Sequence, residues 1–308
     1  MIKIEICCSS IESALTAQKF GASRIELCSE IFLGGITPSI GLIESCKRDL
    51  KIPIRVLLRP RGGDFNYNDE EIKVIINDLT RLKDLEVEGV VIGLSDEKGA
   101  IPLPKLEKIL NTIDGKMNLT FHKAFDYLKK PFQDLKTLVE FGFDTILTSG
   151  GKKTAEEGIN FINKLRSVAN GKISIMPGGG INSENFRGFI IHNYEWIHLS
   201  AKKQANSECK KNIQIPFLEQ PIYIIDTEIL QKIKNQNNVW LPEIGVLNMP
   251  TASSAQGRKK SKAKINIIIS LIYKILILSI NTLIISPKEN KICSITEETV
   301  VRSADFTW

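Results

Sequence analysis

The chain has 308 residues, 43% of them hydrophobic and 25% charged, a composition that predicts a buried core and excludes a wholly disordered chain. The net charge is +6, but residues 236–308 carry nine Lys and Arg against five Asp and Glu, so the first 235 residues are nearly neutral. With 7% aromatic residues, this body lacks the basic surface and the stacking side chains that nucleic-acid binding requires. We therefore expect no nucleic-acid partner.

The cysteines do not follow the spacing of a disulfide framework or a zinc ribbon, and we interpret them as reduced thiols. The first eight residues alternate in polarity and include Lys3 and Glu5, which a signal peptide would not. Both features predict a cytoplasmic protein. The six cysteines are Cys7, Cys8, Cys28, Cys46, Cys209 and Cys293.

Eight short apolar segments recur along the first 200 residues, with starts 22 to 35 residues apart. Each interval has room for a strand, a loop and a helix of roughly 10 to 15 residues, the unit that makes neighbouring strands parallel. Between them, apolar residues at helical spacing and glycines such as Gly21 and Gly142 predict amphipathic helices and their ends. We predict the α/β class and a (β/α)8 TIM barrel with a closing helix at 227–234 and a C-terminal extension. The predicted strands are 2–7, 24–28, 54–59, 89–94, 119–122, 145–148, 173–176 and 196–200.

The composition changes after residue 235, where we place the end of the barrel domain. Residues 236–264 are polar and basic and predict a linker, and 286–308 form a short polar tail. Between them, 265–285 contains fourteen Ile or Leu in 21 residues, long enough to span a bilayer and to tether the barrel to a membrane. Lys274 at its centre opposes insertion, so a low-complexity extension is the alternative.

Strand alternation predicts an unusually polar barrel interior, because one face of each strand lines the inside. Barrel interiors are normally apolar, and ionisable residues at the carboxyl ends of the strands are typical of binding or catalysis. A purely structural alternative is a buried salt-bridge network of Glu5 and Glu26 with Arg24 and Arg59. The predicted inward side chains are Lys3, Glu5, Cys7, Arg24, Glu26, Cys28, Leu57, Arg59, Thr120, His122, Ile146, Thr148, His198 and Ser200.

The loops that follow three of the strands predict a pocket for a small anion. Glycine-rich turns after late barrel strands often present backbone N–H groups to an anion, although each such turn can also be a simple tight turn. The candidate anion-binding residues are Arg59 and Arg61 after the third strand, Gly150 after the sixth, and Gly178, Gly179 and Gly180 after the seventh.

Cys7 and Cys28 form a candidate metal pair on the first two strands. Neighbouring parallel strands lie about 4.8 Å apart, so inward residues at matching heights can bring two sulfurs together. Because each cysteine follows a glutamate, Glu5 or Glu26, by two residues, we expect both sulfurs one layer above both carboxylates. Such a pair can hold an ion in linear two-thiolate coordination, and soft thiolates select Cu(I) or Zn(II). Unliganded, the two cysteines would be small buried hydrophobes.

Seven motifs in order along residues 2–235 resemble those of the CutC copper homeostasis family. The resemblance implies a TIM barrel, a cytoplasmic location, a role in handling intracellular copper, and cysteines at Cys7 and Cys28 that can bind Cu(I). Lys123 departs from the family pattern, which usually has arginine there. The motifs are 24–28 (RIELC), 34–39 (GGITPS), 59–65 (RPRGGDF), 121–126 (FHKAFD), 147–150 (LTSG), 176–180 (MPGGG) and His198.

These features lead to two hypotheses about function. The first is a copper-binding homeostasis protein with Cu(I) on Cys7 and Cys28 and with His198 and Asp126 as weaker candidate ligands. The second is a TIM-barrel isomerase, lyase or hydrolase for a small sugar-like or phosphorylated substrate. Its acid and base groups would be Glu26, His122 and Glu5, and it would use a divalent metal. The sequence does not determine an oligomeric state.

Overall fold

The computed structural model describes residues 1–113, 117–205 and 222–238, so the predicted linker, hydrophobic segment and polar tail lie outside the described residues. Eight parallel strands form one sheet in the order β7-β6-β5-β4-β3-β2-β1-β8, and a bridge between Gly178 and His198 joins β7 to β8. The predicted TIM barrel is confirmed. The strands are β1 (Lys3–Cys8), β2 (Arg24–Leu27), β3 (Ile54–Leu57), β4 (Gly89–Ile92), β5 (Asn118–Phe121), β6 (Thr145–Thr148), β7 (Ser174–Pro177) and β8 (Trp196–Leu199).

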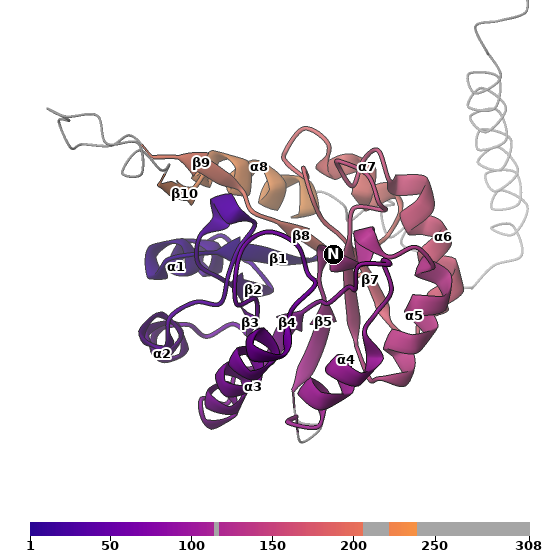
Figure 1. The fold of residues 1–308 in the computed structure, drawn as a ribbon. Coiled ribbons are helices and arrows are strands. Elements are labelled where there is room, and N and C mark those ends of the chain that lie inside the picture. Colours follow the sequence, from indigo (N-terminus) through magenta and orange to yellow (C-terminus); the bar gives the residue numbers. More distant parts are fainter. Residues whose placement is uncertain (114–116, 206–221, 239–308) are drawn as a thin grey trace, which may run out of the picture. The chain divides into compact units, whose positions relative to one another are not determined.

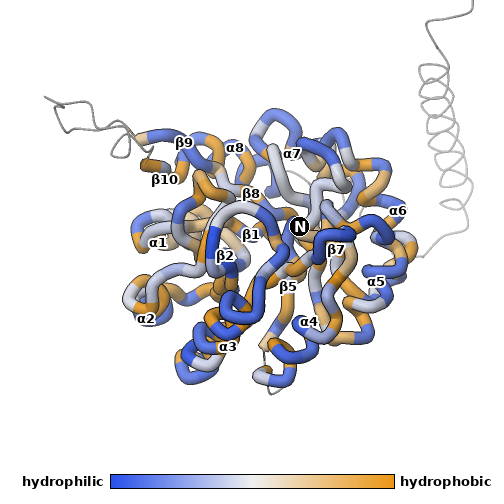
Figure 2. The backbone as a smooth tube through the Cα atoms, viewed as in Figure 1, coloured by the Kyte–Doolittle hydropathy of each residue, from blue (hydrophilic) through white to orange (hydrophobic). Residues whose placement is uncertain are grey.

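Helices surround the strands (Figure 1), and hydrophobic and hydrophilic residues alternate along them (Figure 2). Local signals fix their ends: Asn68 and Glu71 form a reciprocal capping box at the start of α3, and Gly21 follows the end of α1 with φ +91°. The helices are α1 (Ile11–Lys19), α2 (Ile40–Asp49), α3 (Asp69–Asp84), α4 (Leu103–Leu110), α5 (Pro131–Glu140), α6 (Ile159–Ala169), α7 (Phe186–Ile191) and α8 (Thr227–Asn238), with short 3-10 helices η1 (Ile31–Leu33) and η2 (Lys123–Tyr127).

The main core lies between the strands and the helices, and a smaller apolar cluster of Cys28, Leu57 and Val91 lies apart from it. The prediction that Ile146 faces inward with Thr148 is wrong. Ile146 belongs to the main core, whereas Leu147 lines the cavity at the barrel mouth. A parallel strand is buried on both faces, so apolar residues on β6 do not reveal which face is inside.

The amino-terminal end of the barrel interior is closed by Arg55, which is 2% exposed. Its guanidinium donates to Glu88 at 3.0 and 3.2 Å and to Asp144 at 2.8 Å, and it also bonds the hydroxyls of Thr120 and Thr145. This end therefore holds a buried cation with two carboxylate partners.

Two elements follow the barrel strands, the antiparallel pair β9 (Lys202–Gln204) and β10 (Tyr223–Ile225), and then α8. The sequence predicted the helix but not the strand pair. The predicted domain end at 235 lies inside α8, because that helix continues to Asn238. The buried Asn237 side chain accepts from the Ile2 amide at 3.2 Å and donates to the Ile2 carbonyl at 2.9 Å. In the described ranges, none of the helices is long and apolar enough to cross a membrane.

Candidate functional site

A cavity of about 160 Å³ opens at the carboxyl ends of the strands. This is where the inward polar residues of a barrel meet the loops, and where barrel proteins bind their ligands. The lining combines one acidic and thiol-bearing side, one basic side and apolar residues. It consists of Cys7, Glu26, Ile31, Gly34, Gly35, Leu57, Arg59, Phe65, His122, Lys123, Leu147, His198 and Ser200.

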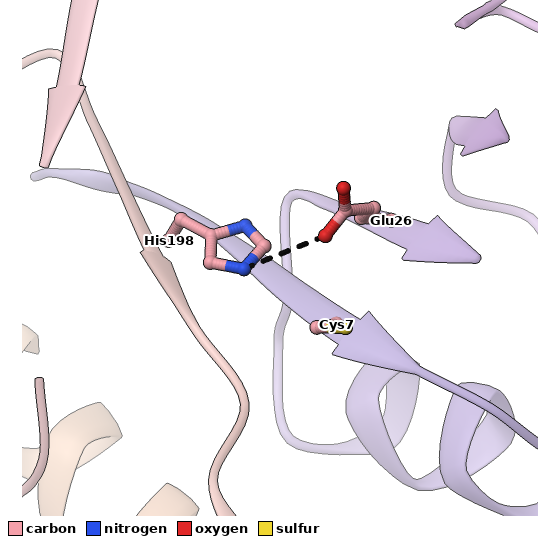
Figure 3. A group of neighbouring side chains, drawn as sticks. All are labelled: Cys7, Glu26 and His198. Atoms are coloured by element: carbon pink, nitrogen blue, oxygen red, sulfur yellow. Dashed lines mark ion pairs between the residues drawn. The ribbon is translucent and has the colours of Figure 1, made fainter. Parts of the chain in front are cut away.

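The acidic side is a chain of buried charges on β8, β1 and β2. Glu5 pairs with the Arg24 guanidinium and with His198, whose Nδ1 lies 2.7 Å from its Oε1. His198 Nε2 lies 3.5 Å from Glu26 Oε2, and Figure 3 shows the two side chains reaching toward each other. Arg24 also stacks on the Trp196 ring at 3.9 Å. Of the predicted salt-bridge network, the structure has the Glu5–Arg24 pair, whereas Glu26 lies beside His198 and not beside either arginine.

The charges on this side stabilise one another. Burial alone would raise the pKa of Glu5, but Arg24 and His198 outweigh it and lower that pKa to about 2. Burial alone would lower the pKa of His198, but Glu26, Cys7 and Glu5 raise it well above its usual 6.5. Burial raises the pKa of Glu26. This raised pKa favours the imidazolium form of His198 between the two carboxyl groups, and that form must lose a proton before the ring can bind a metal.

The two predicted thiols are in contact, with 3.5 Å between Cys7 Sγ and Cys28 Sγ. Their predicted register is wrong, because Cys7 pairs with Glu26 across β1 and β2 and Cys28 lies one layer further out. Gly35 packs beside Cys28, where an added Cβ would lie 3.6 Å from the Cys28 sulfur. At Gly35, φ is +87° and an added Cβ would come within 2.8 Å of the Leu57 side chain. The Cys28 hydrogen bond and burial raise the pKa of Cys7, so without a metal this group is a thiol.

A second donor cluster includes one of these thiols. Cys7, Glu26 and His198 each offer a ligand atom, and these atoms lie within 4.8 Å of one another. The three side chains come from the adjacent strands β1, β2 and β8, as Figure 3 shows. A thiolate, a carboxylate and an imidazole together are ligand types that Zn(II) accepts.

The basic side contains Arg59 and His122. Arg59 is 5% exposed and donates to the carbonyls of Leu33, Gly35 and Gly63 at 2.9, 2.6 and 2.7 Å. His122 Nδ1 accepts from the Ala124 amide at 3.0 Å, so its proton lies on Nε2. Burial and then the Arg59 charge lower the pKa of His122 from 6.5 to about 3. Both Arg59 Nε and His122 Nε2 are buried and have no hydrogen-bond partner among the described residues.

The glycine turn after β6, predicted to hold an external anion, is filled by the carboxylate of Asp126. Asp126 accepts from the Ser149 and Gly151 amides at 3.0 and 2.9 Å and from the Thr148 and Ser149 hydroxyls. Gly150 donates its amide to the Thr148 hydroxyl. Neither Gly150 as an anion donor nor Asp126 as a metal ligand is therefore supported by this geometry.

The other predicted anion groups also lie off the cavity. Arg61 bonds Glu71 at 2.5 Å and Asp64 at 3.0 Å, and it is not part of the cavity lining. The turn of Gly178, Gly179 and Gly180 is not part of the lining either. Of the predicted anion-binding residues, Arg59 is the one that faces the cavity.

Several lining residues were missed in the sequence. Lys123 follows His122 directly and lies at the rim, with its Nζ 4.0 Å from Asp126 Oδ2. The apolar lining from Leu57, Phe65 and Leu147 was not identified as part of a site. Strand parity signals Leu57, but the phase of β6 conceals Leu147, and Phe65 lies in a loop.

Fold and site together define a (β/α)8-barrel protein with a thiol pair and a polar cavity at the carboxyl ends of its strands. The family model described as CutC family matches residues 2–203. The chain is 41% identical over 207 residues to family protein CutC of Glaesserella parasuis serovar 5, covering 67% of this chain and 85% of that protein. For family protein CutC of Enterobacter sp. strain 638, the values are 41%, 67% and 83%.

A solved structure gives the same result. The CutC protein of Streptococcus agalactiae, whose name connects it with copper homeostasis, matches with a TM-score of 0.62 and 33% identity over 64% of this chain and 98% of that chain. The chain therefore belongs to the CutC family.

Proposed function

We propose that the protein binds Cu(I) through the thiolates of Cys7 and Cys28 and serves intracellular copper homeostasis. The observation that carries this proposal is the 3.5 Å contact between the two sulfurs at the barrel mouth. Paired thiolates are the ligands that Cu(I) prefers. The name of the Streptococcus agalactiae relative supports the same ion.

The distance between the sulfurs limits how the ion can bind. A metal–sulfur bond of about 2.3 Å, as in thiolate zinc sites, places the sulfurs of a linear complex about 4.6 Å apart. Linear binding thus requires the sulfurs to separate by about 1 Å, and Cys7 has room to move because it lines the cavity. Since the pKa of Cys7 is raised, Cu(I) must displace its proton, and the apparent affinity should increase with pH.

A second candidate function, a barrel enzyme, is favoured by one observation: Glu26 lines the cavity and burial raises its pKa. A carboxyl group in this state can act as a general acid or base. Glu5 is 0% exposed and tied to two cations, and His122 has a pKa of about 3, so neither suits that role near neutral pH. A divalent metal for such an enzyme would use Glu26, Cys7 and a deprotonated His198.

The copper proposal is tested by titrating the full-length protein with Cu(I) under anaerobic conditions against a chromogenic chelator. We expect one ion per chain for the parent, and loss of that stoichiometric binding in both Cys7→Ser and Cys28→Ser. One thiolate cannot hold the ion in a two-sulfur site. If the double variant binds Cu(I) as tightly as the parent, the proposal is wrong.

Two matched controls use cysteines buried elsewhere. Cys8 adjoins Cys7 but lies in the outer core, and Cys46 lies on α2. Cys8→Ser and Cys46→Ser should keep the parent's copper stoichiometry. Cys8, Cys46, Cys209 and Cys293 all stay in the double variant, so any copper left on it measures what those four thiols contribute.

A further inference from the structure

Three arginines are buried inside the described barrel, and they differ in how their charges are balanced. Arg24 pairs with Glu5, and Arg55 pairs with Glu88 and Asp144. Arg59, 5% exposed, has no carboxylate within 4.0 Å in the described part of the chain. Burying a cation without a counter-ion costs free energy. Of the three arginines, Arg59 is the one that lacks such a partner.

The groups around Arg59 do not balance its charge. Its Nη atoms donate to three backbone carbonyls, which satisfy hydrogen bonds but carry no net charge. Burial raises the pKa of the neighbouring Tyr67 to about 12, so its hydroxyl is neutral and cannot balance the charge. Asp64, in the same loop, interacts with the Arg59 charge, but its side chain is 74% exposed and forms its ion pair with Arg61. Glu26 lies in the same cavity but is directed at His198.

His122 supplies a second unsatisfied group beside Arg59. Its neutral ring carries a proton on Nε2, and that N–H is buried without an acceptor. Phe65 contacts both residues, with its ring 4.8 Å from the His122 ring and 5.1 Å from Arg59 Cζ. Arg59, His122 and the Phe65 ring that contacts both thus line one cavity.

The cavity limits the size and charge of the missing partner. The cavity, with a volume of about 160 Å³, suits a ligand of few non-hydrogen atoms. Arg59 supplies one unbalanced charge, which suits a monoanion better than a phosphate dianion. The β6 glycine turn does not add phosphate donors, because Asp126 occupies it. The apolar lining from Leu57 and Leu147 suits a short carbon chain.

We propose that this cavity binds a small monocarboxylate, with its carboxylate at Arg59 and His122 Nε2 and its carbon chain against Leu57, Phe65 and Leu147. The half-exposed Lys123 at the rim adds attraction for the incoming anion. This site is separate from the thiol pair, although Cys7 lines the same cavity.

The test is calorimetric titration of the full-length protein, without copper, with acetate, propionate and pyruvate at constant ionic strength. We expect saturable 1:1 binding of at least one of them, with a dissociation constant of about 1 mM or lower, the strength that a few non-hydrogen atoms can supply. Inorganic phosphate is titrated in parallel. No saturable binding by any monocarboxylate, or tighter binding of phosphate than of all three, would overturn the proposal.

Two variants locate the site. Arg59→Lys keeps the charge but loses the planar donor set and should weaken carboxylate binding by about tenfold. His122→Asn keeps an acceptor for the Ala124 amide, loses the Nε2 proton and should weaken it by about fivefold. In the parent, the carboxylate should also shift the NMR signal of the His122 Nε2–H, a readout that needs no variant to fold. Unchanged affinity in both variants, or an unmoved signal at saturation, contradicts the proposal.

A copper-deficient control separates the two proposals. Cys28 is buried and is not part of the cavity lining. Cys28→Ser should lose Cu(I) binding yet bind the carboxylate within about twofold of the parent, because it removes no group that the carboxylate touches. Loss of carboxylate binding in this variant would contradict the separate site, whatever the copper result.

Discussion

A buried arginine lies at each end of the barrel interior, and the two arginines differ in their partners. Arg55 and Arg59 lie four residues apart along β3 and its loop, and both are almost fully buried. At the amino end, Arg55 meets two carboxylates and two threonine hydroxyls. At the mouth, Arg59 meets backbone carbonyls and leaves its Nε without a partner.

This difference separates structure from function inside one barrel. A network whose charges are balanced stabilises the fold and has nothing left to offer a ligand. A buried cation and a buried donor without partners lower stability unless a ligand completes them, which is common at functional sites. The closed end should therefore respond to mutation mainly in stability, and the mouth mainly in binding and in pH dependence.

The largest expected effect is at the closed end. Arg55→Met removes the cation and leaves Glu88 and Asp144 facing each other across a buried space. We expect the free energy of unfolding to fall by about 3 to 4 kcal/mol, at the low end for a broken buried ion pair because both carboxylates are partly exposed. Urea unfolding measures it. Arg48→Met, which removes an exposed pair with Asp49, is the control and should leave the free energy of unfolding nearly unchanged. If both variants lose the same free energy of unfolding, the buried Arg55 network does not stabilise the fold more than an exposed ion pair.

A second effect tests the mouth through pH. The unfolded chain protonates His122 near pH 6.5, whereas the folded protein does so only near pH 3. Stability from this group is therefore present above pH 6.5 and is lost as the pH falls toward 3. Between pH 7.5 and 4.5 the parent should lose about 3 kcal/mol relative to His122→Asn. Urea unfolding of both proteins across this range provides the difference, and parallel curves would contradict the buried neutral imidazole.

Much of the fold could be predicted from the sequence because its signals are local. Each strand is a short apolar run at its own place in the βα repeat, and helix ends follow from caps such as Asn68 and glycines such as Gly21. The pair β9 and β10 was missed, since Lys202–Gln204 is polar and exposed and pairs with a strand about twenty residues away. No local pattern marks such a strand.

For the site, the sequence predicted which residues face inward but not how they are arranged. Strand alternation identified Cys7, Cys28, Arg59, His122 and His198 as inward. It did not determine the register that pairs Cys7 with Glu26, because hydrogen bonding between strands sets the register. It also did not reveal that Asp126 fills the glycine turn, since that contact joins residues 23 positions apart through the tertiary fold.

The smallest effect concerns how the closed end is attached to the last helix. Asn237 makes two buried hydrogen bonds to the backbone of Ile2, directly before β1. Asn237→Ala leaves that amide and carbonyl without their partner, at about 1 kcal/mol for each bond, so the free energy of unfolding should fall by about 2 kcal/mol.

Truncation tests the same attachment. A chain ending at Asn235 lacks Asn237 and should unfold at a lower urea concentration than one ending at Asn238, while the longer chain should unfold cooperatively. Adding the Asn237→Ala change to the longer chain should reproduce most of the loss seen in the shorter one. If both truncated chains are equally stable, the contact between Asn237 and Ile2 does not stabilise the fold, and the domain ends at 235. If the chain ending at Asn238 does not fold, residues beyond the described part of the chain contribute to the barrel. Because Asn237 is remote from the mouth, the stable truncated chain should also keep the parent's binding of Cu(I) and carboxylate.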